Sequence, residues 1–463
     1  MPVDPLHLTT GSLLMQTEAN EQAQYGVVAA VQLPGVSDDE FAASLAELRE
    51  LAKTLGYTVT HSFTQKRAAF DAAAYLGVGK RQEIRDFVSA ASEEGTGTRA
   101  APTAAADGER IDVVFVDHEI SPSQARNLEN ELGREVMDRT MVILEIFHRN
   151  ARSRAARAQV EIARLGYMAP RLRERAKLAG PQGRQRSGTG GRGAGESHTE
   201  MDKRKIRDRI AELQQEIAAL DAERKTQRAR RHERQELLRV ALVGYTNAGK
   251  STLMHALTGS DVLVANKLFA TLDTTVRTLH PASVPRVLVS DTVGFIKNLP
   301  HGLVASFTST LDEALDAALL LHVIDAGDAG FERQLAVTDA VLGEIDAQAV
   351  PRLRIFNKID QVGDAAAQAE RAAALRAQYP DCIVMSARRR SDIAALHQAI
   401  VAFFQRGLVE AELFLPWSAQ QLRGEIFASC EVTAERADGD GAFLSVRGER
   451  ATVDGLRTQL GQA

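Results

Sequence analysis

Short apolar runs alternate with helical patterns near the start of the chain, and together they predict a small α/β domain. Gly26–Val31 has the continuous hydrophobicity of a buried strand, and Ile111–Val116 has the same character. Between them, apolar residues recur over 41–51 at the spacing of one helix face. Strands that alternate with helices favour a mostly parallel sheet. We therefore predict an α/β domain over residues 25–138, preceded by an amino-terminal tail of residues 1–24.

Residues 139–238 predict an antiparallel helical hairpin. A long helical pattern runs from about Asp138 to Leu165, and a second helix follows a loop, 181–195, that is rich in glycine and arginine. The second helix has apolar residues at alternating spacings of four and three, which is the a/d seam of a helix pair. These residues are Ile206, Ile210, Leu213, Ile217 and Leu220. Because the first helix is a partner in the same chain, we expect the loop at the tip of a hairpin.

A doubly wound α/β pattern begins at Arg239 and predicts a nucleotide-binding domain over residues 239–405. The strand candidates are Val240–Val243, Arg286–Ser290, Leu319–Ile324, Leu353–Phe356 and Cys382–Met385. Helical patterns start near Lys250, Leu303, Phe331, Ala365 and Ser391. Residues 406–463 contain short alternating stretches such as Glu425–Val432 and Gly441–Val446, and we interpret this segment as a small α+β module.

The composition is that of a globular protein with several domains. The 463 residues are 44% hydrophobic and 25% charged, and no apolar run reaches the ~18 residues that span a bilayer. The two cysteines, Cys382 and Cys430, lie far apart and favour neither a disulfide framework nor a zinc cluster. We expect a cytoplasmic protein with no membrane span, and the sequence leaves contact with a membrane surface open.

Positive charge is concentrated in the predicted hairpin. Residues 151–239 contain 23 Lys and Arg against 12 Asp and Glu, a net of +11, whereas the whole chain has a net charge of −5. A basic segment in an acidic protein is typical of nucleic-acid contact, because each neutralised phosphate releases counterions. It is equally typical of a solvated helical hairpin whose charges keep it in solution. Charge alone does not choose between these two interpretations.

The motif GxxxxGK[ST] follows the first strand of the 239–405 domain and predicts a phosphate-binding loop. It comprises Gly244, Tyr245, Thr246, Asn247, Ala248, Gly249, Lys250 and Ser251. The glycines allow backbone N–H groups to curl around phosphate oxygens, Lys250 neutralises phosphate charge, and the Ser251 hydroxyl is a ligand for Mg²⁺. Strand, loop and helix in this order make a chance match improbable.

A second phosphate motif, DxxG, directly follows the strand that ends at Ser290. It consists of Asp291, Thr292, Val293 and Gly294. A carboxylate at this strand end can hold Mg²⁺ through water, and the Gly294 N–H can meet the γ-phosphate. Between the two motifs, Thr271, Thr274 and Thr275 are all capable of completing the Mg²⁺ shell as part of a switch loop. Spacing alone does not choose among them.

The NKxD motif identifies the base. It consists of Asn357, Lys358, Ile359 and Asp360. Guanine has two adjacent donors that a carboxylate accepts as a bidentate pair, and adenine has no such edge, so Asp360 selects GTP over ATP. Lys358 is expected to stack along the base, and Ser386 and Ala387 are expected to supply a backbone N–H to guanine O6. We predict a GTPase that binds GTP and GDP.

These motifs, and more specific ones before them, resemble the HflX family of ribosome-associated GTPases over about residues 25–405. The marks are Gln65-Lys66-Arg67, Gly77–Lys80, Ser121–Gln124, Asp138–Thr140, Ile143–Phe147, Gln159–Ile162, Phe269–Asp273, Asp291–Phe295, Leu299-Pro300 and Thr310-Leu311. The resemblance implies that Phe269, Ala270, Thr271, Leu272 and Asp273 form the switch segment, with Thr271 as the second Mg²⁺ ligand beside Ser251. With it, Lys250, Thr271 and Gly294 become the expected catalytic residues.

The family resemblance also implies a biological role. It predicts binding to the large ribosomal subunit and its RNA, with the hairpin reaching towards the peptidyl-transferase centre. It further predicts splitting or rescue of stalled ribosomes under stress, with GTP hydrolysis controlling release, by a chain that is monomeric off the ribosome. The hairpin tip departs from the family form, because Lys203 stands where relatives usually have arginine. The fold predicted is thus an α/β P-loop GTPase domain preceded by a small α/β domain and a helical hairpin, with a small α+β module at the end.

Two residues bear on hydrolysis. Phe295 occupies the place of the water-orienting glutamine of Ras-like proteins, so hydrolysis should be slow unless a partner supplies the missing group, and Phe295 can also simply pack beneath the switch. Asn247 lies where related GTPases, in which a hydrophobic residue replaces the glutamine, use an asparagine to help hold K⁺ near the phosphates. K⁺ therefore joins Mg²⁺ as a candidate cofactor.

Two rival functions remain open from the sequence. One is an RNA-remodelling ATPase with a second nucleotide site in the 25–138 domain, although that domain has no GxxxxGK motif. The other is an adaptor that dimerises through the 206–220 seam and uses GTP as a structural ligand.

Overall fold

The computed structural model describes residues 24–93, 110–178, 198–232, 238–259, 268–269, 275–283, 286–297 and 313–462. The chain divides into two compact units, one of residues 1–146 and 167–194, the other of residues 147–166 and 195–463. Five sequence interpretations lie wholly or partly outside the described residues. These are the amino-terminal tail of residues 1–24, the 181–195 loop, the helix near Leu303, the marks at 299–300 and 310–311, and switch residues 270–274. The five-part domain division stays a prediction.

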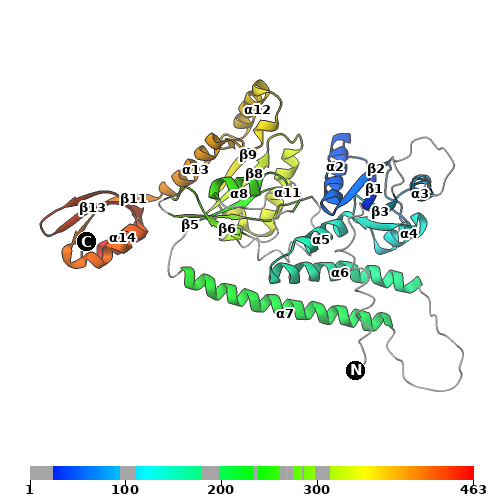
Figure 1. The fold of residues 1–463 in the computed structure, drawn as a ribbon, viewed down its shortest axis with the longest axis horizontal. Helices are drawn as coiled ribbons and strands as arrows, with labels where there is room; N and C mark the ends of the chain where they lie inside the picture. Colours follow the sequence, from blue (N-terminus) through cyan, green and yellow to red (C-terminus); the bar gives the residue numbers. More distant parts are fainter. Residues whose placement is uncertain are drawn as a thin grey trace, which may run out of the picture. The chain divides into compact units, whose positions relative to one another are not determined.

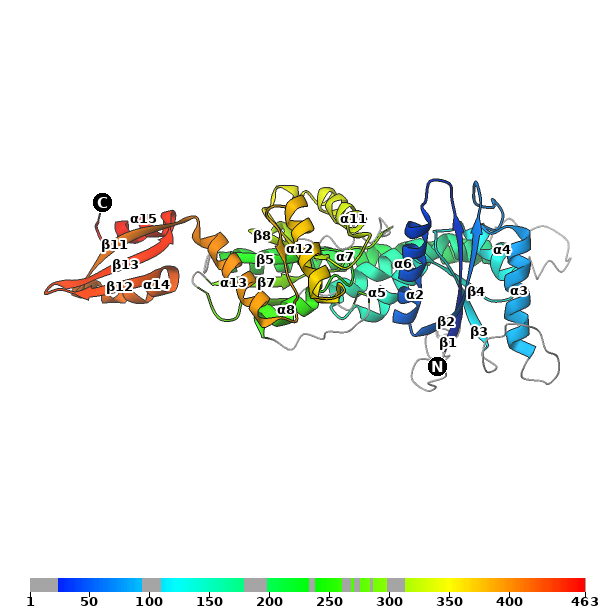
Figure 2. The same ribbon diagram turned by 90° about the horizontal axis from the view of Figure 1, so that it is seen from above.

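The first unit contains the predicted parallel sheet. Its strands are β1 (Gln24–Gln32), β2 (Tyr57–Lys66), β3 (Ile111–Val116) and β4 (Glu135–Asp138), in the order β2-β1-β3-β4, and all neighbours are parallel. Helix α2 (Asp38–Thr54) lies on one face, and α3 (Val78–Glu93) and α4 (Pro122–Leu132) lie on the other (Figure 2). Alternate β1 residues, Val27, Ala29 and Val31, pack against α3 and α4, as expected for a sheet covered on both faces.

The predicted long helix at 138–165 is two helices, α5 (Arg139–Asn150) and α6 (Arg154–Leu178). The break falls at 151–153, where the Ser153 hydroxyl accepts the N–H of Ala156 at 3.1 Å. A serine in this position satisfies one of the free N–H groups at a helix start, so it begins a new helix rather than continuing the old one. The single helix of the sequence analysis is therefore wrong at this point.

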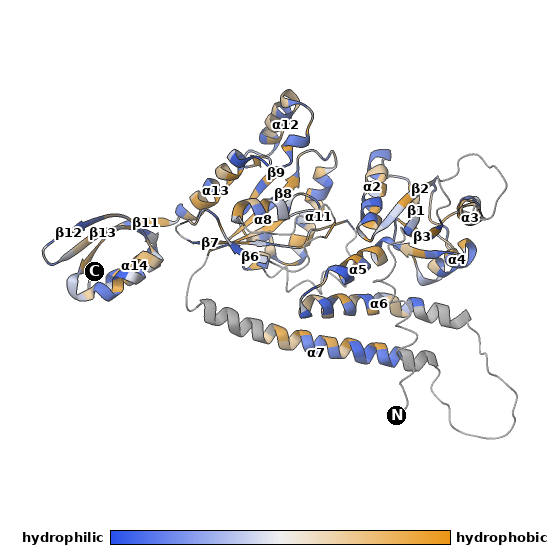
Figure 3. Cartoon of the chain, in the orientation of Figure 1, coloured by the Kyte–Doolittle hydropathy of each residue, from blue (hydrophilic) through white to orange (hydrophobic). Residues whose placement is uncertain are grey.

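Helix α7 (His198–His232) runs antiparallel to the first half of α6, which confirms the hairpin. Arg154 pairs with Glu216 at 2.9 Å, and Glu161 pairs with Arg209 at 3.1 Å. The partner on α7 moves seven residues towards its N-terminus as the residue on α6 moves seven towards its C-terminus, which is the register of an antiparallel pair. Leu213 of the a/d seam is 2% exposed. Figure 1 shows the two helices side by side, and Figure 3 shows apolar and polar residues alternating along the described part of α7.

In the described residues of the nucleotide-binding domain there are six strands, one more than predicted. They are β5 (Leu238–Val243), β6 (Thr275–Thr278), β7 (Val287–Asp291), β8 (Leu319–Asp325), β9 (Arg352–Asn357) and β10 (Ile383–Val384), in the order β10-β9-β8-β5-β7-β6. The strand that sequence analysis missed is β6, which is short, polar and antiparallel to β7 at the sheet edge. The helices are α8 (Lys250–Thr258), α11 (Phe331–Glu344), α12 (Ala365–Gln378) and α13 (Arg390–Gln405), with short 3₁₀ turns η1 (Ala347–Ala349) and η2 (Ile359–Gln361).

The carboxyl-terminal segment is an α+β module, as predicted. Strands β11 (Leu408–Pro416), β13 (Gly441–Glu449) and β12 (Glu431–Ala437) form an antiparallel sheet in that order. A 3₁₀ segment η3 (Trp417–Leu422) and helices α14 (Arg423–Ser429) and α15 (Arg450–Gln459) complete it. The alternating stretch Glu425–Val432 begins in α14 and ends in β12. The buried residues there, Ile426 and Cys430, are four apart, which is a helical spacing.

Among the described residues, no helix combines the length and the apolar character needed to cross a bilayer.

Candidate nucleotide-binding site

The phosphate loop connects β5 to α8 and has a backbone that only glycine permits at two positions. Gly244 has φ of 142°, and a methyl group there would lie 2.2 Å from the carbonyl oxygen of Val323. Gly249 has φ of 97°, and a methyl group there would lie 2.3 Å from Nδ2 of Asn357. The loop thus packs tightly on β8 and β9 and leads into the N-terminus of α8, where free N–H groups attract phosphate.

Lys250 lies folded against this loop. Its ammonium group donates to the carbonyl oxygens of Gly244 at 3.0 Å and Tyr245 at 2.8 Å, and the residue is 6% exposed. Burial lowers the pKa of Lys250 from 10.5 to about 8, and the carboxylate of Asp291 only partly opposes this. An anion bound at the loop would interact favourably with this buried ammonium group.

Ser251 and Asp291 provide a donor set that fits Mg²⁺. The Ser251 hydroxyl donates to Oδ2 of Asp291 at 2.9 Å, and Asp291 is fully buried at the end of β7. A hydroxyl and a carboxylate are hard oxygen ligands of the kind that Mg²⁺ takes beside nucleotide phosphates. Thr275, one of the three candidate switch threonines, begins β6 directly opposite Asp291 in the ladder, whereas Thr271 and Thr274 lie outside the described residues.

The DxxG segment is held against the phosphate loop by backbone bonds. The N–H of Phe295 donates to Gly244 O at 3.1 Å, and the N–H of Thr246 donates to Phe295 O at 2.7 Å. A methyl group on Gly294 would lie 2.9 Å from Cα of Thr246 and 3.0 Å from Nζ of Lys250, so glycine allows this close approach. Thr292 and Val293, the middle residues of the motif, are buried.

Phe295 is 2% exposed, so its side chain packs in the interior of the domain. Its ring is part of the interior and has no polar atom with which to orient water. Its neighbour Lys297 donates its backbone N–H to the Tyr245 hydroxyl at 2.9 Å. Tyr245 is thus a further tie between the phosphate loop and the DxxG segment, one that the motif alone did not indicate.

Asn357 joins three loops at the base-binding end. Its Nδ2 donates to Ala248 O at 3.0 Å, and its Oδ1 accepts the N–H of Ala387 at 2.9 Å. The phosphate loop, the NKxD segment and the Ser386-Ala387 pair are therefore brought together as the sequence predicts. Ile359 and Ser386 are buried, whereas Asn247 is exposed at the outer side of the phosphate loop.

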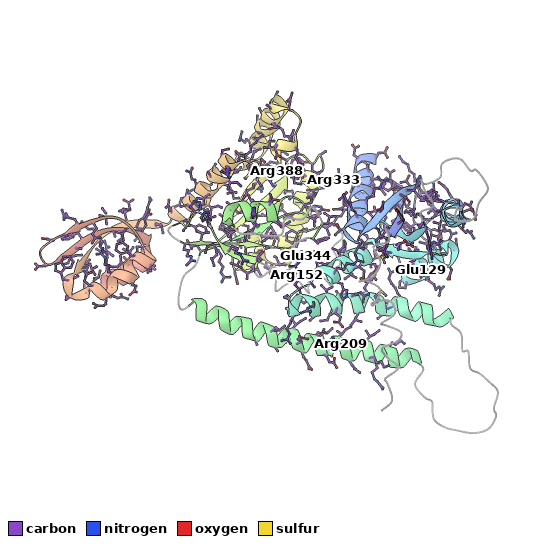
Figure 4. All side chains as sticks on the ribbon, viewed as in Figure 1. Glu129, Arg152, Arg209, Arg333, Glu344 and Arg388 are labelled. Carbon is purple, nitrogen blue, oxygen red and sulfur yellow. The ribbon has the colours of Figure 1, made fainter. Side chains whose placement is uncertain are left out.

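Asp360 and Lys358 have ionic partners in the protein. Oδ2 of Asp360 lies 3.8 Å from Arg388, whose side chain is 71% exposed and which is labelled in Figure 4. Nζ of Lys358 lies 2.8 Å from Oδ2 of Asp325. Sequence reasoning missed both partners, because neither belongs to a motif.

Phe269, the first residue of the expected switch segment, is anchored to the end of α5. Its ring centroid lies 4.6 Å from that of Phe147, and its carbonyl oxygen accepts the Nδ2 amide of Asn150 at 2.8 Å. Phe269 is 3% exposed and has φ of 56°, a left-handed conformation that is uncommon for phenylalanine. The next four residues of the segment, Ala270, Thr271, Leu272 and Asp273, lie outside the described residues.

The sheet order, the phosphate loop and the base-recognition loop define the chain as a P-loop GTPase. Three family models match it: "GTP-binding GTPase N-terminal" at 42–148, "GTP-binding GTPase Middle Region" at 150–231 and "50S ribosome-binding GTPase" at 239–358. The chain belongs to the HflX family of GTPases, enzymes that hydrolyse GTP.

Two relatives show how far the similarity extends. The GTPase HflX of Gluconacetobacter diazotrophicus is 51% identical over 94% of this chain and 97% of its own length. The GTPase HflX of Escherichia coli is 36% identical over 89% of this chain and 91% of its own length. Among solved structures, a GTP-binding protein from the archaeon Sulfolobus solfataricus in complex with GDP is 23% identical and has a TM-score of 0.43, covering 81% of this chain and 99% of that one.

Proposed function

We propose that this GTPase binds the large ribosomal subunit through ribosomal RNA and acts in splitting or rescuing stalled ribosomes, with GTP hydrolysis controlling its release. The observation that carries the proposal is the antiparallel α6–α7 hairpin with its basic surface. Arg204, Lys205 and Arg207 are exposed along α7, and Arg209 (labelled in Figure 4) is about half exposed. Such side chains suit a phosphate backbone. The description of the family model over 239–358 supports the same partner.

In this proposal the phosphate end binds GTP and orders the switch segment. Lys250 neutralises phosphate charge, Gly294 offers its N–H to the γ-phosphate, Ser251 and Thr271 would be the Mg²⁺ ligands, and Asp291 would support the ion through water. Mg²⁺, when bound, would neutralise phosphate charge. The remaining phosphate-loop and DxxG residues, 244–249 and 292–293, bind through their backbone.

At the base end, Asp360 accepts the two guanine donors while Lys358 flanks the ring. Asn357 braces the loop, and the Ser386-Ala387 backbone reaches the guanine oxygen. Because Phe295 is buried and apolar, hydrolysis by the isolated chain is slow and is accelerated when a partner supplies the missing polar group. Asn247 remains the residue through which K⁺ would act, and equal rates in Na⁺ and K⁺ would remove that requirement.

Two features weigh against the rival functions. The a/d seam of α7 is used within the chain, since Leu213 is buried and Arg154 and Glu161 pair with Glu216 and Arg209, so the adaptor loses its dimer surface. We therefore propose a monomer off the ribosome, located in the cytoplasm. In the first unit, Arg139 pairs with Asp117 at 2.9 Å at the carboxyl ends of β3 and β4, where a second nucleotide would bind.

Co-sedimentation with purified large subunits tests the proposal. We expect most of the chain in the pellet with a non-hydrolysable GTP analogue and much less with GDP or without nucleotide. A variant that reverses the charge of exposed α7 residues, Arg204→Glu with Arg207→Glu, should bind GTP normally and pellet poorly. Equal pelleting in all nucleotide states, or full pelleting of the reversed variant, would contradict a GTP-controlled, hairpin-mediated interaction.

A further inference from the structure

Asp325 is fixed at the end of β8, beside the base-recognition loop. In the parallel ladder it lies opposite Asn357, and the N–H of Ala326 donates to Asn357 O at 2.8 Å. Its Oδ1 accepts the N–H of Gly327 at 2.9 Å, which fixes the orientation of the carboxylate. Oδ2 is thereby directed to Nζ of Lys358, 2.8 Å away.

Lys358 is held extended between the phosphate loop and Asp325. Its backbone is left-handed, with φ of 64°, and it follows Asn357 at the end of β9. A methyl group built on Gly249 would lie 3.9 Å from Cε of Lys358, so the lysine stem passes the last glycine of the phosphate loop. The side chains of Lys358 and Asp325 are only 17% and 20% exposed, so solvent screens this ion pair less than it screens a surface pair.

The pair also separates two positive charges. Lys250 follows Gly249 in the chain and Lys358 passes close to the same glycine, so the charge of Lys358 contributes, after burial, to lowering the pKa of Lys250. A carboxylate on Lys358 neutralises one of the two ammonium groups without engaging Lys250, which bonds to loop carbonyls instead. Lys250 therefore keeps its charge for phosphate, while Lys358 presents mainly its methylene stem.

We propose that Asp325 is a positioning residue of the guanine pocket, which holds the Lys358 ammonium so that the lysine stem forms a pre-extended apolar wall for the purine face. This inference rests on the proposed guanine site. A lysine has a flexible four-carbon stem, and ordering it on nucleotide binding costs entropy that the ion pair removes in advance. Asp325 acts on every purine that stacks there, whereas Asp360 reads only the guanine donors.

The test compares Asp325→Asn with wild type in equilibrium binding of GDP, a GTP analogue and inosine diphosphate to the full chain. We expect all three dissociation constants to rise by the same factor, about tenfold to thirtyfold, which corresponds to the rotamer entropy of one lysine. Asp360→Asn should instead change the ratio between guanosine and inosine diphosphates. Asp328→Asn is the matched control. Asp328 lies in the same loop, and its Oδ1 accepts the N–H of the residue two positions later, Gly330, at 2.6 Å, as Asp325 does with Gly327.

A double-mutant cycle with Lys358→Met separates positioning from loop stability. We expect Asp325→Asn to change affinity less than twofold in the Lys358→Met background, since no ammonium remains to be held. The positioning role would be overturned if Asp325→Asn left nucleotide affinity unchanged, or if it weakened affinity as much in the Lys358→Met background as in wild type. Either result would leave the guanine site itself intact. Failure of the wild type to bind guanine nucleotide would instead overturn the proposed site itself.

Discussion

The contact between Asn150 and Phe269 predicts how α5 influences the GTP-bound state. Asn150 donates to the Phe269 carbonyl at 2.8 Å, and Phe147 packs on the Phe269 ring one helical turn earlier. Phe269 lies two residues before Thr271, so its carbonyl is at most about 7 Å of chain from the proposed Mg²⁺ ligand. Fixing Phe269 therefore reduces the entropy lost when the threonine takes its place with GTP.

Replacing Asn150 by alanine removes one hydrogen bond and leaves the buried Phe269 carbonyl without that donor. The net loss is about 1–2 kcal/mol, and 1.4 kcal/mol is a tenfold change in an equilibrium constant. We expect the dissociation constant of a GTP analogue to rise about fivefold to thirtyfold in the presence of Mg²⁺. GDP should be affected less than twofold, because without the γ-phosphate the switch threonine has no place to occupy. Fluorescent-nucleotide titration measures both constants.

His148→Ala is the control, since His148 is exposed on the same turn of α5 and should leave both constants unchanged. Equal weakening of GDP and the GTP analogue by Asn150→Ala would show that the contact supports the domain as a whole. No weakening of either would show that Phe269 is not held by Asn150 in the nucleotide-bound protein. Both outcomes refute the reasoning.

Three further predictions concern single residues. Burial holds the pKa of His322 at about 4, below its ordinary 6.5, so its contribution to stability is complete above pH 6.5 and is lost as pH falls towards 4. Between pH 7.5 and 5.0 we expect the free energy of unfolding to fall by about 2 kcal/mol, measured by urea denaturation of the transition that GDP shifts. His322→Gln should remove most of this pH dependence. Arg388→Ala should change GDP affinity less than about threefold, because its pair with Asp360 is long, at 3.8 Å, and the Arg388 side chain is 71% exposed. A tenfold loss would reveal a direct nucleotide contact. Thr246→Val should raise the nucleotide-free stability by about 1 kcal/mol, because within the described residues the buried Thr246 hydroxyl has no hydrogen-bond partner; calorimetry that finds a decrease would refute this.

The motif residues were predictable because their chemistry is local and their order along the chain is informative. Gly244 and Gly249 occupy backbone conformations that require glycine, so these two residues mark the phosphate loop in the sequence. Asp291 and Asn357 end parallel strands, and the carboxyl ends of parallel strands meet at one edge of the sheet. The assembly of these residues at one end of the sheet therefore followed from spacing and strand order.

The residues that sequence analysis missed act through tertiary contacts. Asp325 looks like any acidic residue at a strand end, and only its distance to Lys358 shows its role. The β6 strand is short and polar, and it forms because β7 offers a free edge. The α14 helix depends on burial of Ile426 against the module's sheet, and a seven-residue helix has little stability of its own. Such features depend on neighbours that a linear pattern does not contain.

Helix α5 connects two sets of contacts that the sequence showed only as separate motifs. At its first residue, Arg139 pairs with Asp117 and Glu47 around the end of the parallel sheet in the first unit. At its end, Phe147 and Asn150 hold Phe269 in the second unit. Arg139, from the motif at 138–140, therefore makes its contacts in the first unit, whereas Phe147, the last residue of the motif at 143–147, makes its contact with Phe269 in the second unit.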